Sequence, residues 1–331
     1  MALNLNFGKK KIVNLTIKDH VIRYAELKNS QDSTVQNWGE RYLPPGLIHE
    51  GTIQDLENFI WIIEECIEDW KISKKQVRFL VPDSSIVIRK LSIPEDVSED
   101  EIKGYLYMEL GTSIHLPFEE PVFDYYLLKE KEKNKQQIIL FASPEDSVTQ
   151  YADVLEEAKL SPLSADISAL ALYRYFYHTN KVEENEHIML VEVDTKTVNA
   201  SIFEEHYPLL MRHLIMEVNE QEWTISTDEF SDNEKLIFSG DKAEVWDSLE
   251  DIYKELEKVM SFYRYTLNKG NKQVTKLVVA GDHPWLSSII ENMKNRFDVP
   301  VLEMKIDQTV NNDPIPSSLL LNIGLGLKEV Q

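Results

Sequence analysis

The chain has 331 residues, of which 43% are hydrophobic, so it is long enough for two domains or one large divided domain with a sizeable buried core. Its formal net charge of −22 argues against nucleic-acid binding and against direct binding to anionic membranes, because both need an excess of Lys and Arg. A single cysteine, Cys66, excludes an internal disulfide, and the lack of a signal peptide or of an apolar run near the roughly 20 residues that span a bilayer leads us to expect a cytoplasmic protein.

The first predicted elements form a hairpin at residues 12–27, IVNLTIKDHVIRYAEL. Apolar and polar residues alternate on both sides of Lys18, Asp19 and His20, which is typical of two strands joined by a short turn. The turn is unusual because it carries charged side chains where glycine or asparagine is common. The patterns that follow predict a third strand over 35–43, a helix over 55–70, and buried strands over 77–82 and 86–93.

The middle of the chain combines short helices with another hairpin. Ser98 and Glu101 form a capping-box pattern that predicts the start of a short helix. Ser143 followed by Pro144 predicts the N-terminus of a second helix, with serine as its cap. The other elements predicted here are strands over 122–128 and 137–142, a charged turn between them at 129–136, and a buried connecting helix over 166–177.

The second half of the chain begins in the same way as the first. When Ile12 is placed on Ile188, the alternating residues of 188–203 coincide with those of the first hairpin, and one turn falls on the other. A third strand-like segment, 207–218, follows again, so the pattern indicates an internal duplication, although spacing alone leaves a chance match of two hairpins open. The elements predicted next are a strand over 236–239, a helix over 246–267, a strand over 276–281, a helix over 284–297, a strand over 300–304 and a last helix over 317–328.

This order of elements resembles the actin/hexokinase-like fold, an α/β fold of two duplicated halves, each with a three-stranded unit followed by a helix and a strand. Several segments resemble the PilM family of type IV pilus assembly proteins, and the fold that this implies is PilM/FtsA-like. These segments are FGKKK at 7–11 and residues 43–55, 93–102, 109–128, 300–304 and 316–327. The resemblance implies a small inserted α+β subdomain. The domains expected from it are a first core at 1–93 and 165–186 with the helix at 316–328 packed on it, the inserted subdomain at 94–164, and the second half at 187–315.

The resemblance also implies that the turns of both hairpins face a nucleotide. In that family glycines let backbone N–H groups approach the phosphates, and an aspartate helps to hold Mg²⁺. This chain departs from the pattern at three places, so it resembles a divergent member with degenerate nucleotide motifs. The positions concerned are Thr16, Lys18, Asp19 and His20 in the first turn, Glu192, Asp194, Thr195 and Lys196 in the second, and Gly281 and Asp282 on the adenosine side.

The charges at these positions argue against nucleotide binding. A carboxylate beside a triphosphate costs on the order of 4 kcal/mol at about 4 Å and moderate dielectric, although Lys18 and Lys196 offset part of this. We expect Lys18 and Asp194 to form a salt bridge that holds the cleft shut, with no catalytic residue, cofactor or metal site. The alternative is an active ATPase that binds ATP with Mg²⁺. A sugar kinase would need a catalytic Asp and a glycine-rich second loop, which we do not find.

A protein partner is the last implication of the resemblance, because PilM proteins bind the N-terminal cytoplasmic tail of the bitopic membrane protein PilN. The chain would then be an adaptor of a pilus or competence machine at the inner face of the cell membrane, with motor ATPases as further partners. In the alternative, its ATP state would switch this contact. The groove walls that the resemblance implies are Arg89, Leu91, Ile93, Tyr105, Met108, Ile114, Leu116 and Phe118, although each of these could instead only pack the inserted subdomain.

Overall fold

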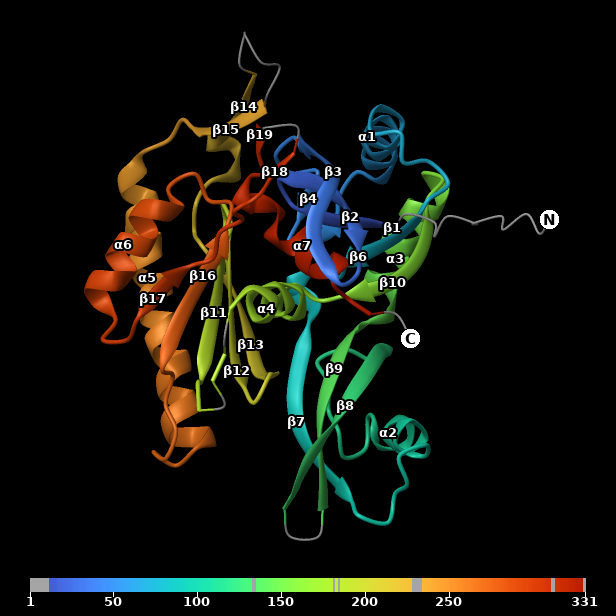
Figure 1. Cartoon of the computed structure of the whole chain (residues 1–331), viewed down its shortest axis with the longest axis vertical. Coiled ribbons are helices and arrows are strands. Elements are labelled where there is room, and N and C mark those ends of the chain that lie inside the picture. The colour runs from blue at the N-terminus through green and yellow to red at the C-terminus, as the bar shows by residue number, and fades with distance from the viewer. Residues whose placement is uncertain are drawn as a thin grey trace, which may run out of the picture.

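The computed structural model describes residues 12–132, 135–180, 182–183, 185–227, 234–310 and 313–329. FGKKK at 7–11 and part of the predicted charged turn at 129–136 lie outside the described residues. Two five-stranded sheets lie side by side, and a three-stranded sheet projects from the first half (Figure 1). No helix within the described ranges is long and apolar enough to cross a bilayer.

The first half is built around a sheet with the strand order β10-β6-β1-β2-β3. Strands β1, β2 and β3 are antiparallel neighbours, whereas β6 and β10 run parallel to β1. Helix α1 (Leu56–Asp69) starts after Asp55, whose carboxylate accepts a hydrogen bond from the N–H of Asn58, and its apolar face packs on the sheet beside α3 (Glu145–Glu157). The strands are β1 (Ile12–Lys18), β2 (Val21–Asn29), β3 (Asp32–Tyr42), β6 (Gln76–Leu80) and β10 (Ser161–Asp166).

The second half repeats this topology with the strand order β13-β12-β11-β16-β17. Again three antiparallel strands are followed by two that run parallel to the first. Helices α5 (Lys242–Ser261) and α6 (Leu286–Arg296) pack on one face, and a π-helical turn, Phe262–Leu267, continues α5. The strands are β11 (Ile188–Val193), β12 (Thr197–Glu204), β13 (Tyr207–Ile215), β16 (Lys276–Gly281) and β17 (Val301–Glu303).

Strand register confirms the predicted duplication. Ile17 pairs with Ile22 in the first hairpin, and Val193 pairs with Val198 in the second. These are the positions that coincide when Ile12 is placed on Ile188. Because a slip of one residue would turn every buried side chain to the other face, an identical register means that both hairpins bury equivalent residues.

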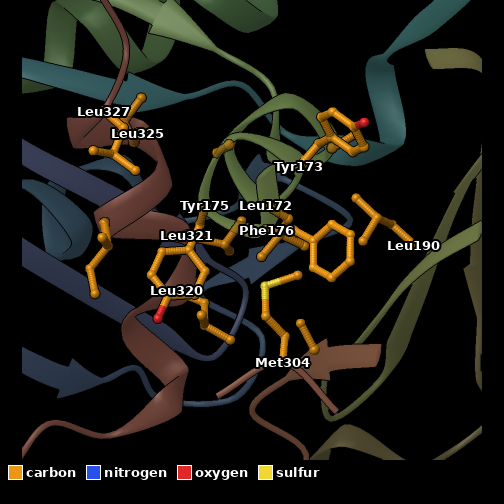
Figure 2. Packing of buried hydrophobic residues seen from close by; sticks show 14 of the residues in the cluster. Leu172, Tyr173, Tyr175, Phe176, Leu190, Met304, Leu320, Leu321, Leu325 and Leu327 are labelled. Atoms are coloured by element: carbon orange, nitrogen blue, oxygen red, sulfur yellow. The ribbon is translucent and has the colours of Figure 1, made fainter. Parts of the chain in front are cut away.

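Two helices join the halves through their apolar faces. Helix α4 (Ser168–Thr179) and helix α7 (Leu320–Gly326) pack against each other between the sheets, and Figure 2 shows their side chains together with Leu190 and Met304 of the second half. Gly324 allows this close contact, because a Cβ there would lie 1.9 Å from the carbonyl oxygen of Ala171. The Asn322 side chain ties α7 to the first sheet by donating to the carbonyl oxygens of β1 and β2 at 3.0 and 2.9 Å.

The inserted sheet has the strand order β7-β9-β8 and a small core of its own with helix α2. Its elements are β7 (Val87–Pro94), α2 (Ile102–Glu109), β8 (Pro121–Glu132) and β9 (Lys135–Pro144). Figure 1 shows this sheet extending away from the two larger ones. Strands β8 and β7 are its edges.

Two predicted helix starts differ from the structure. The helix predicted at Ser98 begins at Ile102, although the Ser98 N–H does donate to the Glu101 carboxylate at 3.2 Å, as in a capping box. Ser143 ends up in β9 rather than at a helix cap, since strand pairing extends that far and its hydroxyl lies 2.9 Å from Ser85 Oγ.

The sequence patterns did not predict β10, and this strand bears on where the inserted subdomain ends. β10 pairs with β6 of the first sheet, and the buried face of α3 packs in the core of the first half. The predicted boundary at residue 164 instead groups both with the inserted subdomain. We propose that this subdomain comprises β7 to β9, and the other boundaries stay predictions.

Short elements complete the chain, and one of them is a hairpin where a single strand was predicted. β14 (Trp223–Thr227) and β15 (Glu234–Phe238) pair with each other and reach back to the first half, where the N–H of Tyr42 donates to Glu234 at 3.1 Å. The remaining elements are β4 (Ile48–His49), β5 (Thr52–Ile53), η1 (Asp83–Ser85), η2 (Glu220–Glu222), β18 (Thr309–Val310), β19 (Asp313–Pro314) and η4 (Ser317–Leu319).

Candidate functional site

The hairpin turns of the two halves meet across a cleft. Lys18 ends β1 in the first half, and its ammonium lies 2.8 Å from Glu192 and 3.2 Å from Asp194 in the second half. The predicted salt bridge between Lys18 and Asp194 is therefore confirmed. Lys18 also lies 2.7 Å from Asp83, the first residue of η1. Asp83 is not among the predicted residues, and its place shortly after a buried strand is its only signal in the sequence.

One ammonium group faces three carboxylates in this cluster, so its charges do not balance. Burial raises the pKa of Glu192 to about 8 and that of Asp194 to about 7, and Lys18 counteracts only part of this effect. Burial alone would lower the pKa of Lys18, but the carboxylates outweigh it and hold that pKa well above its usual value. Lys18 therefore stays charged, and near neutral pH the pair Glu192 and Asp194 retains a proton.

A second contact across the cleft has the opposite arrangement, with one carboxylate between two basic groups. Asp282, just after β16, lies 2.6 Å from the Arg23 guanidinium and 2.8 Å from His20 Nε2. Arg23 also pairs with Glu40 at 2.9 Å. Burial alone would raise the pKa of Asp282, but His20 and Arg23 together hold it well below its usual value. The Asp282 carboxylate therefore stays ionised at neutral pH.

The open space between the turns is divided among small cavities. One of about 260 Å³ is lined by His20, Thr195 and Asp282. A cavity of about 10 Å³ lies among Lys18, Asp194 and Gly281. Another, of about 50 Å³, is lined by Lys18, Asp19 and Lys196. Sites that hold cofactors and other small molecules usually have volumes of about 300–1,000 Å³. In this closed form all three cavities are smaller than this range.

On the adenosine side of the cleft, Asp282 lines the cavity of about 260 Å³, whereas the neighbouring Gly281 and His283 pack against protein. Gly281 has φ +139°, and a Cβ there would lie 2.0 Å from the carbonyl oxygen of Val193, so close packing of two backbones accounts for this glycine. His283 follows, with its ring 5.6 Å from the rings of both Trp223 and Trp285. Among the described residues no group of three His, Cys, Asp or Glu could hold a metal ion. In this closed form the cavities do not fit a magnesium-bound triphosphate, and the loss of nucleotide binding stays a prediction.

The other predicted cleft residues also contact protein groups. Asp19 accepts hydrogen bonds from the N–H groups of Glu50 and Gly51 at 2.7 and 3.0 Å, which holds the turn between β4 and β5. Thr16 Oγ1 donates to Asn322 of α7 at 3.3 Å, Lys196 pairs with Glu220 at 3.0 Å, and Thr195 is buried. Nine of the ten predicted positions thus line the cavities between the turns, Thr16 being the exception, and the part they play there stays a prediction.

The eight predicted groove residues all lie in the inserted subdomain. Ile93 and Ile114 are buried in its core, and Leu91, Tyr105, Leu116 and Phe118 pack partly buried against that core. Arg89 is exposed and donates to the carbonyl oxygen of His115. Met108 is 71% exposed on α2. None of the eight lines the large cavities found among the described residues, so their role in partner binding stays a prediction.

A large cavity with mostly apolar walls lies where the inserted sheet, the first half and the second half meet. We call it the junction groove, and its volume is about 700 Å³. Its lining includes Asp166, which pairs with Arg174 at 2.8 Å and with Lys328 at 3.6 Å. Apolar walls with a few charged groups at the base are typical of a site for a peptide or other organic ligand. The apolar and aromatic residues that line it include Ile86, Phe123, Tyr126, Phe141, Ile167 and Leu170.

The turn between β12 and β13 forms the wall from the second half. Glu205 and His206 have φ of +48° and +72°, in the left-handed region that favours glycine, so the turn is strained. The side chain of His206 is held by Tyr173 of α4, with 2.9 Å between Nδ1 and the hydroxyl. Glu205, His206, Tyr207 and Tyr126 also line a second cavity of about 750 Å³, which extends the groove. No sequence pattern pointed to this surface, because its walls are far apart along the chain.

Comparison with known proteins identifies the family. The sequence profile of "Type IV pilus assembly protein PilM" matches residues 15–222, which is more than half of the chain. The chain belongs to the PilM family. Among solved structures, the PilM-PilN type IV pilus biogenesis complex is similar over 97% of this chain and 100% of the matched chain, with 16% identity and a TM-score of 0.76. The ethanolamine utilization protein EutJ from Carboxydothermus hydrogenoformans is similar over 97% of this chain and 90% of its own, with 10% identity and a TM-score of 0.50.

The predicted actin/hexokinase-like fold with two duplicated halves is thereby confirmed. The PilM profile covers the first half, the inserted sheet and β11 to β13 of the second half. It therefore includes both turns at the cleft, with Lys18 and Asp194, and every wall of the junction groove except Lys328. The segment around Gly281 and Asp282 lies beyond the matched residues.

Proposed function

We propose that this PilM-family protein is a noncatalytic adaptor that binds the cytoplasmic tail of a PilN-like bitopic membrane protein in the junction groove. The observation that carries the proposal is a groove of about 700 Å³ at the meeting point of three parts of the fold. Similarity to the PilM chain of a PilM-PilN complex supports the kind of partner. Through this tail the adaptor is held at the inner face of the membrane, where it couples the partner to motor ATPases.

The groove suits an extended peptide. β8 forms one wall and is an edge strand, so its outer backbone groups can pair with an added strand. Apolar side chains such as Phe141 and Leu170 offer pockets for alternate residues of that strand. Asp124 and Glu205 are exposed on the lining, and with the net charge of −22 they favour a tail that carries Lys or Arg.

Loss of nucleotide binding is the second part of the proposal, and the closed cleft supports it. Lys18 and Asp282 each place a charge among groups of the other half, where a nucleotide would have to lie. The competing function is an ATPase whose nucleotide state switches the partner contact. A thermal-shift titration with Mg-ATP separates the two, because a ligand at about 100 times its Kd stabilises the folded state by about 2.7 kcal/mol. We expect no shift of the melting temperature, and a saturable rise would contradict the adaptor proposal.

Calorimetric titration with a peptide of the membrane partner's cytoplasmic tail tests the groove. Tyr126 is 52% exposed on the groove wall, so Tyr126→Ala should weaken binding by about 30-fold without unfolding the protein, as loss of an aromatic anchor does. Met108→Ala is the matched control, since Met108 is exposed on the same subdomain but outside the groove. If Met108→Ala weakens binding and Tyr126→Ala does not, the surface first predicted from the sequence is the docking site.

A further inference from the structure

We propose that closure of the two halves depends on a proton. The cluster of Lys18, Asp83, Glu192 and Asp194, which we call the latch, holds the cleft shut while it carries a proton and releases it when that proton is lost. Lys18 and Asp83 belong to the first half, whereas Glu192 and Asp194 belong to the second. This proposal does not depend on the docking of a membrane-protein tail.

The geometry leaves the latch short of positive charge. Lys18 is only 14% exposed, so water screens the excess negative charge poorly. Asn199 donates to Asp83 at 2.9 Å and to Glu192 at 3.2 Å, but it brings no charge. An interior group of one ammonium and three carboxylates is stable only if a carboxyl takes up a proton or the cluster becomes exposed to water.

Among the described residues, the other charged or titratable groups beside the latch are already engaged. Asp282 balances Arg23, while burial lowers the pKa of His213, so that its imidazole is neutral where the latch titrates. None of these neighbours adds a free positive charge to the cluster. The groups that face the latch from adjacent elements are Asp19, bound to backbone N–H groups, His20, bound to Asp282, Lys196, bound to Glu220, and His213, bound to Asn199.

The direction of the pH dependence follows from the proton count. In the closed form burial raises the pKa of Glu192 to about 8 and that of Asp194 to about 7, whereas carboxyls exposed by opening return to about 4. At any pH between the pKa values of the open and closed forms, the closed form binds more protons than the open form. A rise in pH therefore favours opening, by about tenfold in the open-to-closed ratio per pH unit for each proton released to solvent.

The second contact across the cleft limits how the halves separate. The pKa of Asp282 is held well below its usual value by His20 and Arg23, after burial is overcome, so deprotonation of the latch does not weaken this contact. The α4–α7 packing is apolar and does not titrate either. Deprotonation therefore acts on the latch alone, and these two contacts limit how far the halves separate.

Distances between spin labels across the cleft test the proposal. Glu57 on α1 and Glu244 on α5 are exposed and belong to different halves, so Glu57→Cys and Glu244→Cys provide two labelling sites. Cys66 is buried and burial raises its pKa to about 12, so the native thiol does not take the label. We expect one short distance at about pH 6 and a growing population of longer distances by about pH 9.

Glu192→Gln is the decisive variant because its amide mimics the protonated carboxyl. It should keep the short distance at every pH, and Asp194→Asn should do so too, which covers the case that one variant folds poorly. Glu220→Gln is the matched control, since Glu220 pairs with Lys196 outside the latch, and it should retain the native pH response. An unchanged distance distribution across the pH range in the native sequence, or the same response in Glu192→Gln as in Glu220→Gln, would overturn the proposal.

Discussion

Removal of the shared ammonium group is the most direct perturbation of the cleft. Lys18→Met keeps much of the side-chain volume but leaves Asp83, Glu192 and Asp194 without a counter-charge. Each contact with an ionised carboxylate, at 2.7 to 3.2 Å, corresponds to about 5 to 6 kcal/mol of Coulomb attraction at an effective dielectric constant of about 20. Much of this Coulomb attraction only compensates for the hydration that the same groups have in the unfolded chain and lose on burial.

The net loss is therefore smaller than the Coulomb attraction. Loss of one partner from a buried ion pair costs about 3 to 5 kcal/mol, because a buried charge is left uncompensated. The 331-residue chain has an unfolding entropy of roughly 0.7 kcal/mol/K on the usual per-residue value, so the melting temperature should fall by about 4 to 7 °C at about pH 7.5. At about pH 5.5 the loss of stability caused by Lys18→Met should be smaller, because the carboxyls left without a counter-charge bind protons. The loss falls by about 1.4 kcal/mol per pH unit for each additional proton that the folded variant binds.

Differential scanning calorimetry at both pH values measures these changes. Lys196→Met is the matched control, because Lys196 lies in the neighbouring turn but forms a single partly exposed ion pair with Glu220 at 3.0 Å. Its loss should cost no more than about 1 kcal/mol at either pH. The reasoning about the latch is wrong if Lys18→Met and Lys196→Met lower the melting temperature equally, or if the effect of Lys18→Met does not depend on pH.

Four further predictions concern packing and accessibility. Gly281→Ala should lower the free energy of unfolding by about 1 to 3 kcal/mol, because φ +139° and the backbone of β11 leave no room for a Cβ. Gly104→Ala, with no atom within 4 Å of the added Cβ in α2, should instead stabilise the protein by up to about 1 kcal/mol. Gly324→Ala should destabilise it by about 1 to 3 kcal/mol in urea unfolding, because the new methyl group meets the backbone of α4. Cys66, whose pKa burial raises to about 12, should react with a thiol reagent only after denaturant is added, and a fast reaction of the folded protein would contradict its burial.

The sequence predicted best the parts of the fold that local patterns determine. Both hairpins alternate apolar and polar residues, so their strands, their turns and even the shared register follow from the residue pattern alone. β10 shows the opposite case. Its sequence, SPLSAD, has no alternation and includes a proline, yet it forms a strand because β6 offers a parallel edge to pair with. Tertiary pairing decided that element.

The same distinction applies to the functional surfaces. Lys18 and Asp194 could be paired from the sequence because they occupy equivalent places in the two duplicated hairpins. Asp83 could not, since one carboxylate after a buried strand carries no sign of what it will face. The junction groove was missed for a related reason. Its walls, β8, α4 and the turn at Glu205, are each ordinary segments that become a groove only when the fold brings them together.

The duplication itself explains why opposite charges meet at the latch. Because the two hairpins have the same register, Lys18 and Asp194 occupy equivalent positions at the ends of β1 and β11 and approach each other across the cleft. Identical residues at these two positions would place like charges, or two small side chains, in contact. A nucleotide can separate such turns, but a cleft closed by protein alone needs unlike residues at equivalent positions. Lys18 against Asp194 meets this requirement, and the additional carboxylates of Asp83 and Glu192 make the closure sensitive to protons.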